Sequence, residues 1–333
     1  MNQSMWGSSS TKLFHELGPD EILKSLDKRG FKTTGRILPM NSFENRVYEV
    51  EIENPNATQP SENFIIAKYY RPGRWTKEQI LEEHEFLLDL KNQEIPVIAP
   101  IVVDGISLFN LENSDIYYSI FPKQGGRSPD EFDLPTTQQL GRTLGRIHAV
   151  GKLKTCHHRL TLNAKNYGLS NLETILSNNF VPPHLKKSYE SVAKTVCQIA
   201  TTSLTSFPVQ RIHGDCHKGN VLWRPEGLFF IDFDDMVLGP PVQDIWLLFP
   251  SRDDDSKRQI DEFLNSYEEF YSFDDQSLKI IEVLRALRLI HFSAWIGKRF
   301  EDQAFQKSFS WYGTDNYWQE QIQDLEDQIK LIQ

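Results

Sequence analysis

The chain has 333 residues, of which 39% are apolar, 12% aromatic and 25% charged, and its formal net charge is −10 at pH 7. This length exceeds what one hydrophobic core usually serves, so the composition favours two lobes and excludes a largely disordered chain. The acidic balance disfavours non-specific nucleic-acid binding, which needs a basic surface to displace counterions from phosphates.

The cysteines and the apolar runs indicate a compartment. Cys156, Cys197 and Cys216 are widely spaced and odd in number, unlike the disulfide framework of a secreted domain. The N-terminus lacks the basic start and apolar run of a signal peptide, and no stretch approaches the roughly 18 apolar residues of a membrane span. We therefore expect a cytoplasmic protein without a membrane partner, with residues 1–10 as a loose polar tail.

The first third of the chain predicts a small sheet and one helix. Residues 46–52 and 63–70 are rich in β-branched and aromatic side chains and flank a turn-rich segment, which predicts a hairpin. Residues 76–93 carry apolar side chains at helical spacing behind Thr76, a good N-cap. Further short apolar runs follow, up to a break rich in glycine and proline at 121–130.

Helices dominate after that break, and a small hairpin interrupts them. Periodicity predicts helices over 136–153, 184–204, 255–271, 275–300 and 316–333. The runs VLW and LFFID, joined by a turn, predict the hairpin at 221–232. We therefore expect an N-terminal lobe over 12–121 and a C-terminal lobe over 122–333, with a hinge at about 120–127.

Residues 211–235 concentrate the side chains that carry chemistry. Asp215 follows His213 and Gly214, Asn220 lies five residues later, and Asp232 ends an apolar strand. In protein kinases a loop with this spacing supplies an aspartate that accepts the proton of the substrate hydroxyl and an asparagine that holds a metal ion, and a later aspartate binds Mg²⁺. The pattern predicts a phosphotransferase.

Such a site also requires a strand lysine for the phosphates and a helix glutamate to pair with it. Lys68 lies in the apolar run FIIAKYY, and the following helix offers Glu82 and Glu83. The plain alternative is an edge lysine that faces water.

The phosphate-covering loop of a kinase would fall at 38–50, where no GxGxxG is present. The Ser42 hydroxyl and neighbouring backbone N–H groups can donate to phosphate oxygens instead. The alternative for the neighbours of Ser42 is a turn that only links two strands.

The loop HGDCHKGNVLW with FFIDFDDMVLGPPVQDIW resembles the aminoglycoside phosphotransferase and choline kinase-like group. A wider set of segments, spread over residues 12–333, resembles the bacterial stress response kinase A family. The set is NSFENRVYEV, KYYRPGRWTKEQILEEHEF, FPKQGGR, HGDCHKGN, GPPVQDIW and LRALRLIHFSAW.

The resemblance implies an α+β, bilobal protein-kinase-like fold that uses ATP and Mg²⁺ to phosphorylate Ser or Thr in proteins under envelope and oxidative stress. We expect ATP and a protein substrate as partners, no nucleic acid, and a monomer. The implied roles are Asp215 as proton acceptor, Asn220 and Asp232 as metal ligands with Asp232 also counted as catalytic, Lys68 paired with Glu83 for the phosphates, Ser42 as an ATP contact, and Phe121 in the hinge over adenine.

The sequence also departs from the eukaryotic kinase pattern. Gly214 replaces the arginine that usually pairs with an activation-loop phosphate, IDFDD replaces DFG, and no APE follows. These differences argue against control by activation-loop phosphorylation. We expect Asp244 either to hold the catalytic-loop backbone through its carboxylate or to serve as a helix N-cap.

Three other functions remain open. A two-metal phosphoesterase could use His213, Asp215, His217 and the acidic group 232–235, with help from Cys156-His157-His158, but it leaves Lys68 unexplained. A small-molecule phosphotransferase acting on an aminoglycoside, choline or another hydroxylated substrate would share the fold and the loop. A non-catalytic binding module is disfavoured because the expected site residues are all retained. Cys216 and His217 are expected to pack or to shape the loop.

Overall fold

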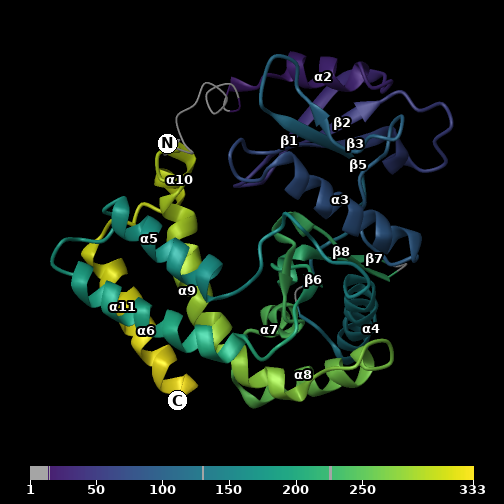
Figure 1. Ribbon diagram of the computed structural model, residues 1–333. Helices are drawn as coiled ribbons and strands as arrows, with labels where there is room; N and C mark the ends of the chain where they lie inside the picture. Colours follow the sequence, from purple (N-terminus) through teal and green to yellow (C-terminus); the bar gives the residue numbers. More distant parts are fainter. Residues whose placement is uncertain (1–13, 15, 130, 225–226) are drawn as a thin grey trace.

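The computed structural model describes the chain except for residues 1–13, 15, 130 and 225–226. The polar tail expected over residues 1–10 and the start of the first lobe at residue 12 lie outside the described residues. Figure 1 shows a small sheet with its helices at one end of the molecule and a larger helical part at the other. The expected α+β arrangement is confirmed.

Five strands form an antiparallel sheet in the order β1-β2-β3-β5-β4. They are β1 (Thr33–Met40), β2 (Arg46–Ile52), β3 (Phe64–Tyr69), β4 (Phe109–Asn110) and β5 (Tyr117–Pro122), and the short 3-10 turn η1 (Pro60–Asn63) precedes β3. The predicted hairpin is confirmed as β2 and β3, with Val47 opposite Lys68. On its other side Lys68 pairs with Ser119 of β5, so the lysine lies on a central strand and the edge alternative is wrong.

Two helices accompany the sheet. The predicted helix is confirmed as α3 (Lys77–Asn92), and the Thr76 side chain accepts a hydrogen bond from Gln79 N at its start. The sequence pattern did not reveal α2 (Pro19–Asp27), whose Ile22 and Leu26 are buried among the apolar side chains of the sheet. The proline at its first position and the spacing of these two residues are the signals that could have identified it.

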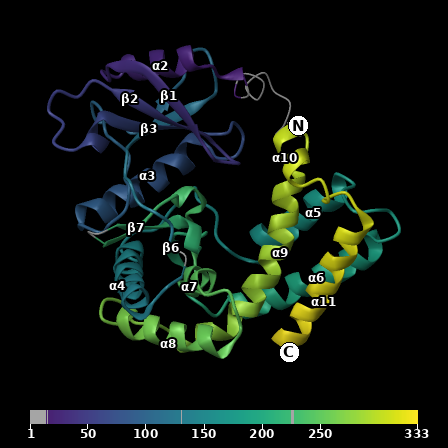
Figure 2. The ribbon, with the colours of Figure 1, turned by 180° about the vertical axis from the view of Figure 1, so that it is seen from behind.

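The helical part forms the rest of the molecule. It contains α4 (Leu134–Gly151), the π-helical turn η2 (Ala164–Leu169), α5 (Ser170–Ser177), α6 (Lys186–Leu204), α7 (Val242–Leu248), α8 (Asp254–Tyr267), α9 (Ile281–Gly297), α10 (Gln303–Ser308) and α11 (Asp315–Ile332). Four predicted helices are confirmed as α4, α6, α8 and α11. Figure 2 shows α4 beside α8, and the C-terminus at the foot of this part, away from the sheet.

The helix predicted over 275–300 is wrong in its first six residues. These residues form the 3-10 turn η5 (Asp275–Ile280), and α9 begins only at Ile281. The Asp274 carbonyl accepts a hydrogen bond from Ser277 N at 2.8 Å, and its side chain accepts one from Gln276 N at 3.0 Å. Such bonds tighten the chain into a 3-10 turn before the α-helix starts.

Two short strand pairs hold the loops that bear the acidic residues. β6 (Gln210–Ile212) pairs with β9 (Val237–Gly239), and the predicted small hairpin is confirmed as β7 (Val221–Arg224) with β8 (Gly227–Phe230). The loop from β6 to β7 contains η3 (Lys218–Asn220), and the loop from β8 to β9 contains η4 (Phe233–Asp235). Both loops therefore end on paired strands, which fixes where Asp215 and Asp232 lie.

The apolar core joins α3 to the helical part. Phe86 and Leu90 of α3 are buried in one apolar cluster with residues of α4, α8 and the β7–β8 hairpin. Apolar side chains of the sheet form a separate cluster with α2. Within the described ranges, no helix combines the length and the apolar character that crossing a bilayer requires.

Candidate active site

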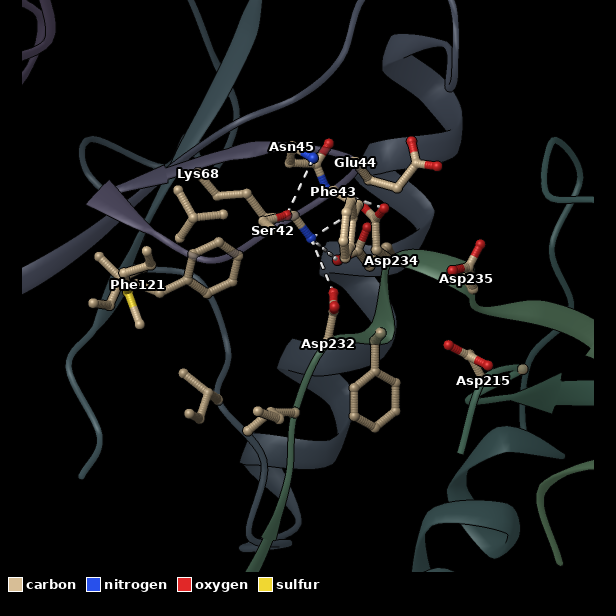
Figure 3. A pocket seen from close by; sticks show the side chains of 18 of the residues that line it. Ser42, Phe43, Glu44, Asn45, Lys68, Phe121, Asp215, Asp232, Asp234 and Asp235 are labelled. Carbon is tan, nitrogen blue, oxygen red and sulfur yellow. Dashed lines mark hydrogen bonds and ion pairs between the residues drawn. The ribbon is translucent and has the colours of Figure 1, made fainter. Parts of the chain in front are cut away.

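A cavity of about 590 Å³ lies where the sheet meets the helical part. Among its lining residues are six that the sequence predicts, which are Ser42, Lys68, Glu83, Phe121, Asp215 and Asp232. Asn220 does not line it. In Figure 3, Phe121 and Asp215 lie on opposite sides of the cavity, with Lys68 and Asp232 between them. The structure therefore brings side chains from distant segments of the chain to one site.

Lys68 is buried and surrounded by carboxylates. Its Nζ lies 3.0 Å from Asp234 Oδ1, 3.5 Å from Asp232 Oδ1 and 3.8 Å from Glu83 Oε1. Burial by itself lowers the pKa of this ammonium group. The charges of Asp234, Glu83 and Asp232 raise the pKa by more than burial lowers it, so the pKa is well above its ordinary value. Lys68 is therefore a fixed positive charge at the centre of the site.

The two candidate glutamates of α3 have different roles. Glu83 faces Lys68 and also accepts a hydrogen bond from Arg159 at 2.9 Å, and its burial raises its pKa to about 7. Glu82 points to another loop, where its carboxylate accepts hydrogen bonds from the backbone N–H groups of residues 157–159. Arg159 also donates to the Asp234 carbonyl at 2.6 Å and to the Gln79 carbonyl at 2.7 Å. These bonds fasten α3 to the helical part.

Asp234 is a site residue that the sequence analysis named only within the acidic group 232–235 of the phosphoesterase alternative. Its carboxylate contacts Arg74, accepts a hydrogen bond from Asn45 Nδ2 at 3.2 Å, and pairs with Lys68. Burial raises the pKa of this carboxyl, but Arg74 and Lys68 lower it more, so the group stays ionised. The signal in the sequence is the run IDFDD, in which one residue, Phe233, separates Asp234 from Asp232.

Asp244 holds the catalytic-loop backbone. Its Oδ2 accepts a hydrogen bond from His213 N at 2.8 Å and its Oδ1 accepts one from Gly214 N at 2.9 Å. The N-cap alternative is wrong because Pro241 occupies the cap position of α7. Gly214 has φ +85°, and a Cβ there would collide with the carbonyl oxygen of Asp235. A glycine is therefore required between His213 and Asp215.

Both carboxylate oxygens of Asp215 have partners. Oδ1 lies 2.8 Å from a guanidinium nitrogen of Arg288 on α9, and Oδ2 lies 3.4 Å from His217 Nε2. Burial raises the pKa of this carboxyl, but the hydrogen bond from His217 and the charge of Arg288 lower it more. Asp215 is thus an ionised acceptor, a state in which it can receive the hydrogen bond of a substrate hydroxyl.

Asp232 and Asn220 carry oxygen atoms of the kind that Mg²⁺ binds, and of the two Asp232 lines the cavity. Asp232 adopts φ 60°, and 56% of its side chain is exposed on the cavity side. The Asn220 amide nitrogen donates to the Asp215 carbonyl at 2.9 Å, so the amide oxygen is left as the acceptor. One carboxylate, one amide oxygen and the phosphates of a nucleotide form the ligand set that Mg²⁺ commonly takes, so these residues fit the expected ion.

The loop between β1 and β2 is fastened to the helices on the other side of the cavity. The Glu44 carboxylate pairs with Arg299 at 2.5 Å and accepts a hydrogen bond from the Trp295 indole N–H. Trp295 lies near the C-terminal end of α9, and Arg299 follows that helix. The ring of Phe43 packs on Phe305 of α10, with ring centroids 5.9 Å apart. Ser42 Oγ accepts a hydrogen bond from Asn45 N, which stabilises the turn that borders the cavity.

The histidines and Cys216 do not form a metal cluster. Among the described residues, no group of three or more His, Cys, Asp or Glu side chains is arranged to hold a metal ion, as a two-metal phosphoesterase would require. Cys216 is buried, and burial raises the pKa of its thiol well above the ordinary value. His217 accepts a hydrogen bond from Gly219 N at 3.0 Å and so shapes the loop.

Residues 36–281 match the family model of the phosphotransferase enzyme family. The chain therefore belongs to this family of kinase-like phosphotransferases. Within it, the chain is 36% identical over 327 residues to stress response kinase A of Escherichia coli strain K12, with 98% of this chain and 97% of the relative covered. The family resemblance expected from the sequence is confirmed.

Two further proteins place the fold. Serine/threonine protein kinase RdoA of Salmonella typhimurium is 34% identical over 320 residues, which cover 96% of this chain and 94% of the relative. The solved structure of an amicoumacin kinase in complex with AMP-PNP, Ca²⁺ and Ami is 18% identical, with a TM-score of 0.69 over 88% of this chain and 92% of that chain. The structural likeness confirms the expected kinase-like fold.

Proposed function

We propose that this phosphotransferase is an ATP- and Mg²⁺-dependent serine/threonine protein kinase of the stress-response type. The observation that carries the proposal is that Lys68, held by Glu83 and Asp234, shares one cavity with the ionised carboxylate of Asp215. The names of the two curated relatives support a kinase, and one of them names serine and threonine.

The nucleotide would lie between Phe121 and Asp215. Phe121 lines the end of the cavity near β5, where an apolar ring suits adenine, and Ser42, which also lines the cavity, would contact the phosphates. Lys68 would bind the phosphate oxygens, since its ammonium group is already charged and oriented. Asp232 and Asn220 would hold Mg²⁺, which neutralises charge on the phosphates when bound.

Asp215 would orient the acceptor. A substrate hydroxyl that replaces one of the present partners of Asp215 would point its oxygen at the γ-phosphorus. The new bond forms between that oxygen and phosphorus, the bond to the β–γ bridging oxygen breaks, and ADP leaves. The hydroxyl proton passes to the Asp215 carboxylate late in the transfer, because this carboxylate is a weak base.

The second candidate is a small-molecule phosphotransferase on the same fold. The complex of the amicoumacin kinase favours it, because the small molecule named with that kinase is its ligand. Both candidates predict the same nucleotide site and differ only in the acceptor. We also propose that the protein is a monomer and is located in the cytoplasm.

A transfer assay with labelled ATP separates the two candidates. The chain is incubated with generic proteins, alone for autophosphorylation, and with a panel of aminoglycosides and amino-alcohols. Label in protein and none in the small molecules would support the protein kinase, and the reverse result would replace it by the second candidate. Asp215→Asn, as a matched control, should remove the label in either case.

A further inference from the structure

The acceptor end of the cavity is distinct from the nucleotide end. Figure 3 shows Asp215 and Asp235 on the side away from Phe121. Arg288, His291 and Phe292 of α9 line this same cavity. Any acceptor whose hydroxyl reaches the carboxylate of Asp215 must therefore lie against α9.

Arg288 is the arginine paired with the carboxylate that such an acceptor must reach. One of its guanidinium nitrogens lies 2.8 Å from Asp215 Oδ1, and 40% of its side chain is exposed. Among the described residues, Asp215 is the one acidic side chain at ion-pair distance from it. A guanidinium group has five N–H donors in a planar fork, so Arg288 can bind a second anion while it remains beside Asp215.

The other charged groups near this end have partners of their own. The carboxylate of Asp235 is 2.6 Å from Arg74, and the neighbouring Lys298 donates to Asn171 at 3.0 Å. His291 stacks on Tyr167 with ring centroids 4.7 Å apart, and burial lowers its pKa to about 3, so it is neutral.

The aromatic rings of α9 pack on one another, and Phe292 keeps 40% of its surface exposed. The Trp295 ring lies 5.7 Å from the ring of Phe292, and the Arg299 guanidinium lies 5.2 Å from the Trp295 centroid. Arg288 is therefore the group beside Asp215 that attracts an anionic acceptor and repels an ammonium group.

We propose that Arg288 determines acceptor specificity, by binding an anionic group next to the acceptor hydroxyl and by repelling a cationic acceptor. The proposal rests on the proposed function in placing the acceptor at Asp215. The acceptor is then a serine or threonine with an acidic residue beside it. The acidic side chain binds the Arg288 guanidinium while the hydroxyl binds Asp215.

The test compares matched acceptors on matched variants. Three peptides share one central serine and differ only in the flanking residues, which are glutamate, glutamine or lysine. Each is assayed for kcat/KM with the wild type, Arg288→Gln and Arg288→Glu, and with Arg258→Gln as the control. Arg258 is an exposed arginine of α8 that pairs with Asp255 outside the cavity.

We expect the wild type and Arg258→Gln to prefer the glutamate peptide over the glutamine peptide by about tenfold. The ratio should approach one in Arg288→Gln and invert in favour of lysine in Arg288→Glu, with the KM for ATP unchanged within about threefold. The same preference for the glutamate peptide in the wild type and in Arg288→Gln would overturn the proposal, even if Arg288→Gln is slower with every peptide.

A second arm separates this proposal from the protein kinase assignment. It offers small acceptors in pairs, a hydroxy acid against an amino-alcohol of equal size. Transfer to the hydroxy acids but to no peptide would overturn the protein kinase and support the anion site. Preferred transfer to the amino-alcohols would overturn the role of Arg288, and transfer to none of the probes would overturn both.

Discussion

Lys68 lies 3.0 Å from Asp234 and 3.8 Å from Glu83, so its nearest acidic partner comes from the loop after β8 and not from α3. Asp234 thus links the lysine of the sheet, Arg74 and the loop that carries Asp232. The relationship gives the acidic run IDFDD a structural function beyond its first aspartate.

Replacement of Asp234 should destabilise the protein. Asp234→Asn leaves Lys68 and Arg74 buried with less compensation, and we expect a loss of about 3 kcal/mol in the free energy of unfolding. Asp235→Asn is the control, since this neighbour is more exposed and pairs with Arg74 alone among the described residues, and it should cost less than about 1 kcal/mol. Urea unfolding measures both, and equal losses would contradict the central place of Asp234.

Replacement of Asp215 should separate transfer from nucleotide binding. Asp215→Asn removes the ionised acceptor for the substrate hydroxyl, and we expect kcat to fall by at least about 100-fold. The affinity for AMP-PNP should stay within about threefold, because the proposed nucleotide contacts Lys68 and Asp232 are unchanged in this variant. Kinetics and calorimetry test this together, and a loss of nucleotide binding with retained turnover would show that the role is misassigned.

His84 gives the stability a pH dependence. It is buried, with ring nitrogens 2.9 Å from Ser107 Oγ and 2.9 Å from Tyr70 OH, and burial, Lys68 and Arg159 lower its pKa to about 3. The unfolded chain takes up a proton near pH 6.5, so this contribution is present above that pH and is lost as pH falls towards 3.

The difference in unfolding free energy between the wild type and His84→Gln isolates this group. Below pH 6.5 the wild type should lose about 1.4 kcal/mol per pH unit relative to the variant. Urea unfolding at pH 7.5, 6.0 and 5.0 measures the difference. Parallel curves would mean that His84 is protonated in the folded protein.

The contacts of Glu44 should control how fast nucleotide leaves. Glu44→Gln weakens the ion pair with Arg299 that fastens the β1–β2 loop to α9, and we expect release of a fluorescent ATP analogue to become about tenfold faster. Glu51→Gln is the control, because Glu51 lies on β2 and pairs with the exposed Arg36 at 3.6 Å. Stopped-flow release rates that are equal in the two variants would exclude a role of Glu44 in closing the loop.

Local patterns in the sequence carried much of the fold. The β2–β3 hairpin, α3 behind Thr76 and the hairpin at β7–β8 follow from periodicity and turn residues, which act over short distances. The spacing and order of the kinase-like motifs also predicted Lys68 and Asp215 as site residues. The short α7 and α10 escaped because six or seven residues contain less than two full periods of a helix.

The missed parts of the site depend on contacts between distant segments. Asp234 gains its place from Arg74, and Arg288 approaches Asp215 from a helix more than seventy positions later in the chain. Neither pairing has a local sequence signal, because it forms only when the sheet, the loops and α9 come together. Glu82 and Glu83 are adjacent in the sequence, and only the direction of each side chain separates them.

The bonds of Glu82 and Arg159 also bear on regulation. The N–H groups of residues 157–159 and the Arg159 guanidinium hold α3 in the position that pairs Glu83 with Lys68. A switch that swings this helix outward would have to break all of these bonds at once. The pairing of Glu83 with Lys68 therefore needs no rotation of α3 to form.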